Sequence, residues 1–179
     1  MRLKEKYETE VVPAMIKRFG YSTALAVPKM VKVSINSGTG KALKDEKLLE
    51  AVQATLTRIS GQRPALTKAR KSISAFKIRA GMTVGVRVTL RGSRMYDFVE
   101  KLIHVSLPRV RDFQGLDPKS IDQYGNLSIG FKEHVVFPEI RSDEVERTIG
   151  LEVTITTNSK TREEGTELLT MLGFPFKKD

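Results

Sequence analysis

Residues 82–91 alternate between apolar and polar side chains without interruption, and this pattern constrains the fold most strongly. The apolar set consists of Met82, Val84, Val86, Val88 and Leu90. The polar set consists of Thr83, Gly85, Arg87, Thr89 and Arg91. A period of two with β-branched residues predicts a strand that is buried on one face only. Arg87, Thr89 and Arg91 then point to solvent, and Gly85 leaves room for another backbone segment to approach closely.

The positive charge of the chain is concentrated around this strand. The window from Ala51 to Tyr96 contains ten Lys and Arg residues and no Asp or Glu, whereas the remaining residues carry 21 side chains of each sign. Neutralising a phosphate releases counterions, so dense positive charge favours binding to a polyanion. A surface that is basic for solubility alone would mix both signs. Arginines on an open sheet suit RNA, because guanidinium groups bind phosphate bidentately and stack on bases.

Composition narrows the class of protein further. A chain of 179 residues with 40% hydrophobic content can bury the core of one domain, with a protruding subregion. There is no apolar run of membrane-spanning length, and the charged N-terminus lacks the apolar region of a signal peptide. The sequence therefore predicts a cytoplasmic protein without a membrane partner. The absence of Cys excludes disulfides, thiolate nucleophiles and Cys-rich zinc sites.

Further periodic segments predict the other elements. We expect a helix over 3–19 that ends at Gly20, a second that is capped by Asp45 and closed by Gly61, and a third that is capped by Ser93 and ends before Pro108. A short helix is expected over 142–148. The last helix covers 161–172 and begins with a capping box formed by Thr161 and Glu164. We expect strands over 31–36, with Val31, Val33 and Ile35 inward and Asn36 outward; over 126–131; and over 151–156, with a short extended piece at 62–68.

Strands interleaved with helices in this order predict an α+β fold. The sheet is mainly antiparallel, helices pack on one face, and the other face is open for RNA, a layout shared with RRM domains. We expect a single domain over residues 1–179, with a basic protruding loop near 69–82 that is flexible because its periodicity is broken.

Two features of the chain allow more than one interpretation. The run from Ser37 to Lys41 ends like a P-loop, but Ile35 and Ala42 replace the required Gly and Ser or Thr, so nucleotide binding is rejected. Its glycines either let amides approach an RNA phosphate or form a tight turn with positive φ. Phe76 lies among basic residues, and it belongs either to the core or to an exposed surface that stacks on a base.

No constellation of residues for catalysis is present. His104 and His134 are not accompanied by a carboxylate pattern, and a lone His is more often structural. Asp112 and Asp117 lack the spacing of a metal loop. We therefore expect no enzyme activity, no metal and no cofactor.

Seven short strings together resemble the family of the fifth protein of the large ribosomal subunit, which binds 5S ribosomal RNA. They are LTKARKS at 66–72, FKIRAG at 76–81, VTLRG at 88–92, LPRVRDFQGL at 107–116, FPEI at 137–140, LEVTITT at 151–157 and GFPF at 173–176. They follow the family order over essentially the full chain at bacterial length.

The resemblance implies a structural protein that helps to form the central protuberance. Contacts to 5S RNA are implied for Asn36, Gln62, Phe76, Thr89 and Arg91, to which we add the basic neighbours Arg63, Lys68 and Arg87. The loop with Lys71, Ser72, Lys77 and Arg79 is expected to contact peptidyl-site transfer RNA. Arg109, Arg111, Arg141 and Asp143 are expected to face a protein of the small-subunit head. Other expectations are a contact with 23S ribosomal RNA and a monomeric state within the ribosome.

The chain departs from the family at Lys41, where an acidic or neutral residue is usual, and at Gln123 to Asn126, which replace an Arg-Gly-Asn arrangement. Lys41 adds a potential phosphate contact, and the role of Tyr124 stays open. Two rival functions are a free-standing RNA chaperone or regulator and a basic enzyme acting on nucleic acid. The enzyme would need a cluster of carboxylates or His near the basic sheet, and the window without acidic residues argues against one.

Overall fold

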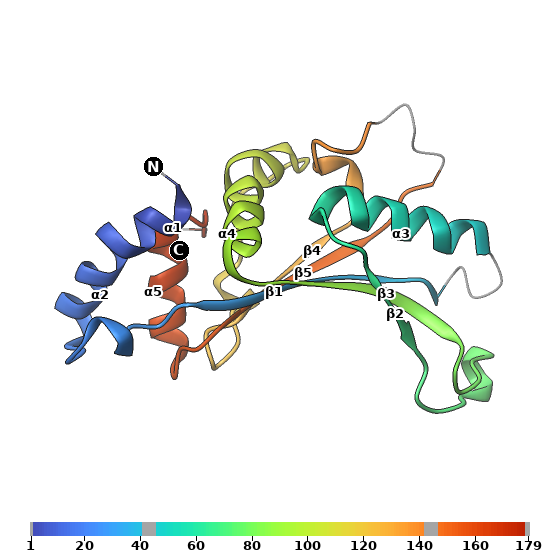
Figure 1. Ribbon diagram of the computed structural model, residues 1–179, viewed down its shortest axis with the longest axis horizontal. Coiled ribbons are helices and arrows are strands. Elements are labelled where there is room, and N and C mark those ends of the chain that lie inside the picture. The colour runs from blue at the N-terminus through green and yellow to red at the C-terminus, as the bar shows by residue number, and fades with distance from the viewer. Residues whose placement is uncertain (1, 41–45, 142–146, 178–179) are drawn as a thin grey trace. The chain divides into compact units, whose positions relative to one another are not determined.

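The computed structural model describes residues 2–40, 46–141 and 147–177 (Figure 1). The chain forms two compact units. Unit 1 comprises Met1–Val33, Leu90–Ile129 and Thr154–Asp179, and unit 2 comprises Ser34–Thr89 and Gly130–Val153. The single domain expected from the sequence stays a prediction. Across the described ranges, no helix is both long and apolar enough to span a membrane.

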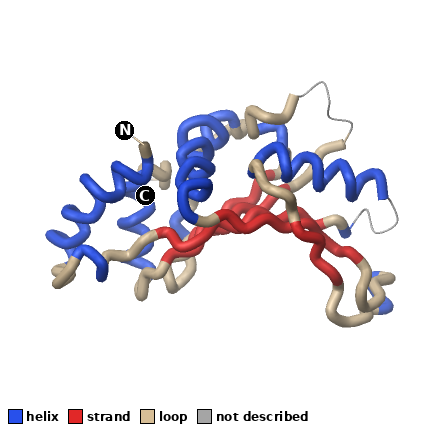
Figure 2. The backbone as a smooth tube through the Cα atoms, in the orientation of Figure 1, coloured by secondary structure: helices blue, strands red, loops and turns tan. Residues whose placement is uncertain are grey.

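The described residues contain a five-stranded sheet with the strand order β2-β3-β1-β5-β4 (Figure 2). Its strands are β1 (Met30–Gly38), β2 (Ala65–Lys68), β3 (Thr83–Leu90), β4 (Leu127–Phe131) and β5 (Leu151–Thr157). Alternate side chains are buried, as in β4, where Leu127, Ile129 and Phe131 are buried and Ser128 and Gly130 are exposed. Sheet and helices together confirm the predicted α+β class.

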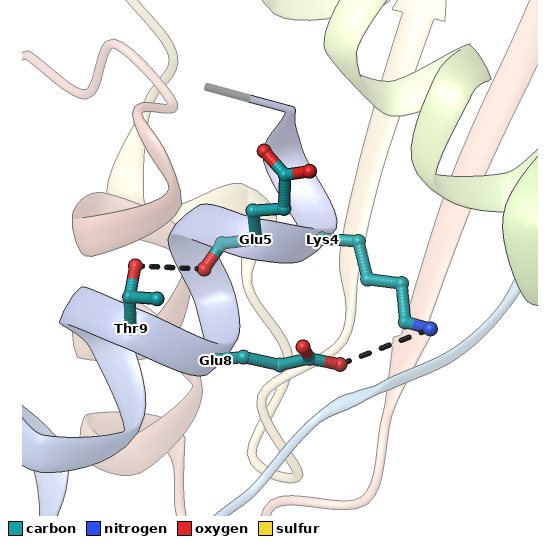
Figure 3. A network of polar contacts seen from close by, with 4 residues as sticks. All are labelled: Lys4, Glu5, Glu8 and Thr9. Carbon is teal, nitrogen blue, oxygen red and sulfur yellow. Dashed lines mark hydrogen bonds and ion pairs between the residues drawn. The ribbon is translucent and has the colours of Figure 1, made fainter.

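Helices of unit 1 begin at the N-terminus. The segments α1 (Leu3–Lys6), a π-helical turn (Tyr7–Val11) and α2 (Val12–Phe19) follow one another and end at Gly20, whose φ is 72°. Pro13 lies in the first turn of α2, directly after the π-helical turn, so the helical chain continues through the proline. Lys4 and Glu8 form an ion pair of 3.8 Å, and the Thr9 hydroxyl donates to the Glu5 carbonyl at 2.8 Å (Figure 3). The predicted first helix is confirmed.

Two further helices of unit 1 are α4 (Gly92–Lys101), which continues as a π-helical turn (Leu102–Ser106), and α5 (Arg162–Leu172). The predicted cap at Ser93 is wrong, because α4 begins one residue earlier and Arg91 occupies the N-cap position. In α5 the predicted capping box is present, with Thr161 Oγ1 accepting from the Glu164 amide at 3.2 Å. Gly173 ends the helix with a φ of 107°.

A close backbone contact joins the turn before β4 to α5 within unit 1. A Cβ placed on Gly125 would lie 2.7 Å from the Cα of Gly165, which excludes any side chain at either residue. The turn is held by the Asp122 carboxylate, which accepts hydrogen bonds of 2.9 Å from the amides of Tyr124 and Asn126. The departure from the family pattern at Gln123 to Asn126 therefore forms an ordered turn, and Tyr124 is 58% exposed on it.

Unit 2 is built on α3 (Glu46–Ser60), which buries Val52, Leu56 and Ile59 and ends at Gly61 with a φ of 65°. In Figure 1, α3 lies on one side of β1 and β3, and the basic loop, residues 69–82, extends on the other side. The predicted cap at Asp45 and the departure at Lys41 lie outside the described residues, as does most of the expected short helix over 142–148.

Two expectations around β1 need correction. Val31 is 36% exposed, whereas the preceding residue, Met30, is 4% exposed. Gly38 and Gly40 do not have positive φ, so the tight-turn interpretation is wrong. The chain there continues the sheet instead, with the Thr39 amide donating to the Val84 carbonyl at 3.1 Å.

Candidate nucleic-acid interface

The open face of unit 2 is the side of β1 and β3 that carries Ser34, Asn36, Gly85, Arg87 and Thr89. Arg87 is exposed, and Asn36 and Thr89 are half-buried. The alternate positions Ile35, Val86 and Val88 are at most 2% exposed. The period-two pattern thus predicted the direction of these side chains correctly, because only one face of these strands is covered.

Gly85 lies in close contact with the neighbouring strand. A Cβ at this position would lie 3.1 Å from the Ser37 carbonyl oxygen, and 3.9 Å from both Asn36 Oδ1 and Thr67 Cβ. The expected close approach of a second backbone segment is confirmed. A side chain at residue 85 would crowd the Ser37 carbonyl, which explains why a glycine stands in the middle of this strand.

The pairing of β2 with β3 becomes irregular at Lys68. Ala65 pairs with Arg87 and Thr67 with Gly85, so both β2 residues share the open face. The register shifts between Thr67 and Lys68, because Lys68 pairs with Thr83 and Val84 of β3 is passed over. All four residues of β2 are exposed, so Lys68 adds a positive charge to the exposed surface of this strand.

Gln62 and Arg87 are both tied to the strands by hydrogen bonds. Gln62 follows the end of α3, and its Nε2 donates to the Thr89 carbonyl at 3.2 Å. Arg87 Nη2 donates to Ser34 Oγ at 3.2 Å. The neighbouring Arg63 is exposed. The structure thus brings Asn36, Gln62, Lys68, Arg87 and Thr89 into one part of unit 2.

The basic loop has an ordered internal structure. Ile73 and Ile78 exchange two backbone hydrogen bonds of 2.9 and 3.1 Å. Ser72 Oγ accepts from the Ala80 amide at 2.9 Å. A 3-10 turn (Ser74–Phe76) lies between the two isoleucines. The broken periodicity of the loop therefore reflects hydrogen-bonded turns, and its flexibility stays a prediction.

The tip of the basic loop presents a ring and charges to solvent. Phe76 is 67% exposed, so the interpretation of Phe76 as a core residue is wrong. Lys77 follows it in the left-handed conformation, with φ of 55°. Lys71, Ser72 and Arg79 are also exposed. An exposed aromatic ring among cations suits a nucleobase, because the base stacks on the ring while its phosphates meet the positive charges.

The remaining predicted residues lie apart from this cluster in the chain. Arg91 is exposed and belongs to unit 1, as do the exposed Arg109 and Arg111. Arg141 is exposed and belongs to unit 2. Asp143 lies outside the described residues.

Acid–base and metal chemistry have no visible basis in the described ranges. They contain no group of three or more His, Asp or Glu side chains that could hold a metal ion. His134 is only 3% exposed, and its Nδ1 accepts a hydrogen bond of 3.1 Å from the Ile149 amide. Burial lowers the pKa of His134 below its ordinary value, so the ring is neutral near pH 7. The structural role expected for a lone His fits this arrangement.

Sequence reasoning missed two features that shape the interface. They are the hydrogen bond from Arg87 to Ser34 and the anchoring of Gln62 on Thr89. Both depend on which segments are neighbours and in which register, and this does not follow from the pattern of a single segment. The sequence holds no local signal for either contact.

Comparisons with known proteins agree with one another over nearly the whole chain. The family model "Ribosomal protein L5" matches residues 24–79, and the model for the C-terminus of the same ribosomal family matches residues 83–176. A large ribosomal subunit protein uL5 of Carboxydothermus hydrogenoformans is 51% identical over 177 residues, covering 99% of both chains. Those of Streptococcus thermophilus and Dictyoglomus thermophilum are 52% and 54% identical, and the matches cover 98–99% of each chain.

Proposed function

Since the chain belongs to the ribosomal protein L5 family, we propose that its open face and basic loop bind ribosomal RNA, with 5S RNA as the principal ligand. The resemblance noted in the sequence is confirmed by this membership. The protein is a structural, non-enzymatic component of the bacterial large ribosomal subunit, bound to ribosomes in the cytoplasm. Membership of the family leaves no basis for the free-standing regulator or the nucleic-acid enzyme.

The observation that carries the proposal is the gathering of RNA-binding side chains on one face. Arg87 supplies positive charge, Asn36 and Gln62 supply amides, and the exposed Lys68 adds a second charge on the neighbouring strand β2. The window from Ala51 to Tyr96 holds no carboxylate that would repel a phosphate. Amide and hydroxyl groups beside arginines can contact both phosphates and ribose hydroxyls, which double-stranded RNA displays in its shallow groove.

The same reasoning assigns the finer partners. Binding of 5S RNA would give the protein a place in the central protuberance, where contact with 23S RNA follows. The basic loop contacts peptidyl-site transfer RNA through Lys71, Ser72, Lys77 and Arg79, all of which are exposed. Arg109, Arg111 and Arg141 face a protein of the small-subunit head, and the protein acts as a monomer in the ribosome.

The test is direct binding of the full chain to 5S RNA with an unrelated structured RNA as competitor. Thr89→Ala and Arg91→Ala should weaken 5S binding without unfolding the protein, because neither side chain is buried. Loss of one phosphate contact at Arg91 should lower the salt slope by about one unit. Lys17→Ala, an exposed charge on α2, is the matched control and should leave binding unchanged. Equal binding of both RNAs would overturn the proposal.

A further inference from the structure

Arg87 stands on a surface of small residues. Ala65 lies opposite Arg87 on β2, and Gly85 precedes it on the same face of β3. Ser34 on β1 accepts a hydrogen bond of 3.2 Å from Nη2 of Arg87. Small neighbours cannot fix a long side chain by packing against it, so the bond to Ser34 is the contact that directs the guanidinium.

Ser34 is more buried than its place in the sequence predicts. The alternation puts it on the solvent face, yet it is only 8% exposed. A hydroxyl with so little access to water needs a partner within the protein. Arg87 supplies this partner with one of the five N–H donors of its guanidinium, and the other donors remain available in a planar fork.

We infer that Ser34 is a positioning residue for RNA binding, because it holds the Arg87 guanidinium in place on the open face before the ligand arrives. The inference rests on the proposed function of the open face. Its ligand group is a backbone phosphate, since the fork of an arginine matches two phosphate oxygens. An arginine that is mobile before binding loses conformational freedom when the RNA binds, which would reduce affinity by about 2- to 12-fold. The bond to Ser34 removes much of this loss, because the side chain is already held in place.

The inference predicts different salt behaviour for the two members of the pair. Arg87→Ala removes a charge, so both the affinity for 5S RNA and the salt slope should fall, the slope by about one unit. Ser34→Ala keeps the charge but frees the guanidinium. Its affinity should fall by about 3- to 10-fold while the salt slope stays that of the unmodified protein.

The experiment measures 5S RNA binding of the full chain at several salt concentrations for the two single variants and the double variant. Ser34 acts through Arg87, so the double variant should bind no more weakly than Arg87→Ala alone. Ser34→Thr retains the hydroxyl on a residue that strands favour, and it should restore affinity to within about twofold.

Ser37→Ala is the matched control on the same strand. Ser37 is 1% exposed, and its hydroxyl donates to the Gly150 carbonyl at 2.9 Å, so this variant removes a buried hydroxyl that has no contact with Arg87. It should lower the melting temperature and leave RNA affinity unchanged. An equal loss of affinity in Ser37→Ala and Ser34→Ala would indicate general destabilisation and overturn the positioning role.

Additive losses in the double variant, unchanged binding of Ser34→Ala, or failure of Ser34→Thr to rescue would each refute the inference. Failure of the proposed function looks different in the same experiment. In that case the unmodified protein would not prefer 5S RNA over the unrelated competitor, and the five variants would bind both RNAs alike.

Discussion

The open face and the basic loop, both in unit 2, present similar side chains but are held in different ways. On the open face, each functional group depends on a distant segment: Gly85 meets the backbone of Ser37, Gln62 bonds to the Thr89 carbonyl, and Arg87 bonds to Ser34. The basic loop is closed by hydrogen bonds among its own residues, such as those that join Ala69 to Met82 and Gly81. A change that disturbs a backbone contact of the open face, such as that of Gly85, should therefore lower the stability of the fold as well as binding. A change to the contacts within the loop should leave the rest of the fold intact.

The strongest way to break this comparison is to place the same charge on neighbouring residues of β3. Val88 is 2% exposed, and Val88→Asp buries an unpaired carboxylate at a cost of about 4–5 kcal/mol or more, a large part of the stability of a small protein. We expect no cooperative unfolding transition by circular dichroism. Arg87→Asp, on the exposed side, should keep its melting temperature and lose RNA affinity. A folded Val88→Asp protein would show that the two faces of β3 are assigned wrongly.

Phe76 tests the loop side of the comparison. Because its ring is 67% exposed, Phe76→Ala should leave the melting temperature nearly unchanged and weaken 5S RNA binding by about 1–3 kcal/mol through lost stacking. Ile73→Ala is the control, since Ile73 is a 45% exposed apolar residue of the same loop without an aromatic face. It should bind normally. A fall in stability of about 3–5 kcal/mol in Phe76→Ala, as for a core Phe, would contradict the exposed role.

The same substitution can be made at one glycine in each region, and we expect a smaller loss of stability from it. Gly85→Ala places a Cβ 3.1 Å from a carbonyl oxygen that the sheet holds in position, so we expect a loss of stability of about 1–3 kcal/mol together with weaker RNA binding. Gly81→Ala meets no atom within 4 Å, but its φ of 88° disfavours Ala. Its strain of about 1–2 kcal/mol should disorder the loop, seen as faster exchange of the Ala80 amide, while the global melting temperature holds. Equal melting temperatures for both variants would show that the open face and the basic loop contribute to the stability of the fold in the same way.

The sequence predicted what depends on one segment. Period two in β3 identified Val86 and Val88 as buried and Arg87 as outward, because a strand with one covered face must alternate. The capping box of Thr161 and Glu164 was found because both residues lie in one turn. The end of a strand was harder to predict, since alternation does not show at which residue burial begins. Val31, near the start of β1, was expected to be buried and is exposed.

What the sequence did not predict depends on pairing between segments. The contact of Arg87 with Ser34 requires β1 and β3 to be neighbours, and the pairing of Lys68 with Thr83 includes a register shift that no local pattern marks. The ordered turns of the basic loop were also missed, because hydrogen bonds such as that from Ala80 to Ser72 involve a side chain whose geometry a periodicity does not encode. The candidate site was thus predicted in its residue types and faces, but not in the bonds that orient it.

The last prediction concerns variants with the smallest expected effect on the fold, and it tests whether the two regions bind different RNAs. In the combined variant Lys77→Asn and Arg79→Ser, two charges leave the basic loop while Phe76 and the paired Ile78 remain; Asn tolerates the left-handed conformation that Lys77 adopts. Lys68→Ser removes one exposed charge from β2, the strand that pairs with β3. The loop variant should bind 5S RNA almost normally and retain peptidyl-site transfer RNA less well on reconstituted ribosomes. Lys68→Ser should do the reverse, because its charge belongs to the sheet, where a permanent RNA contact would bind. Each protein should melt at the temperature of the unmodified chain, since all three side chains are exposed. Parallel losses of both activities in both variants would show that the loop and the open face act as one surface, and the difference in how they are held would then have no counterpart in what they bind.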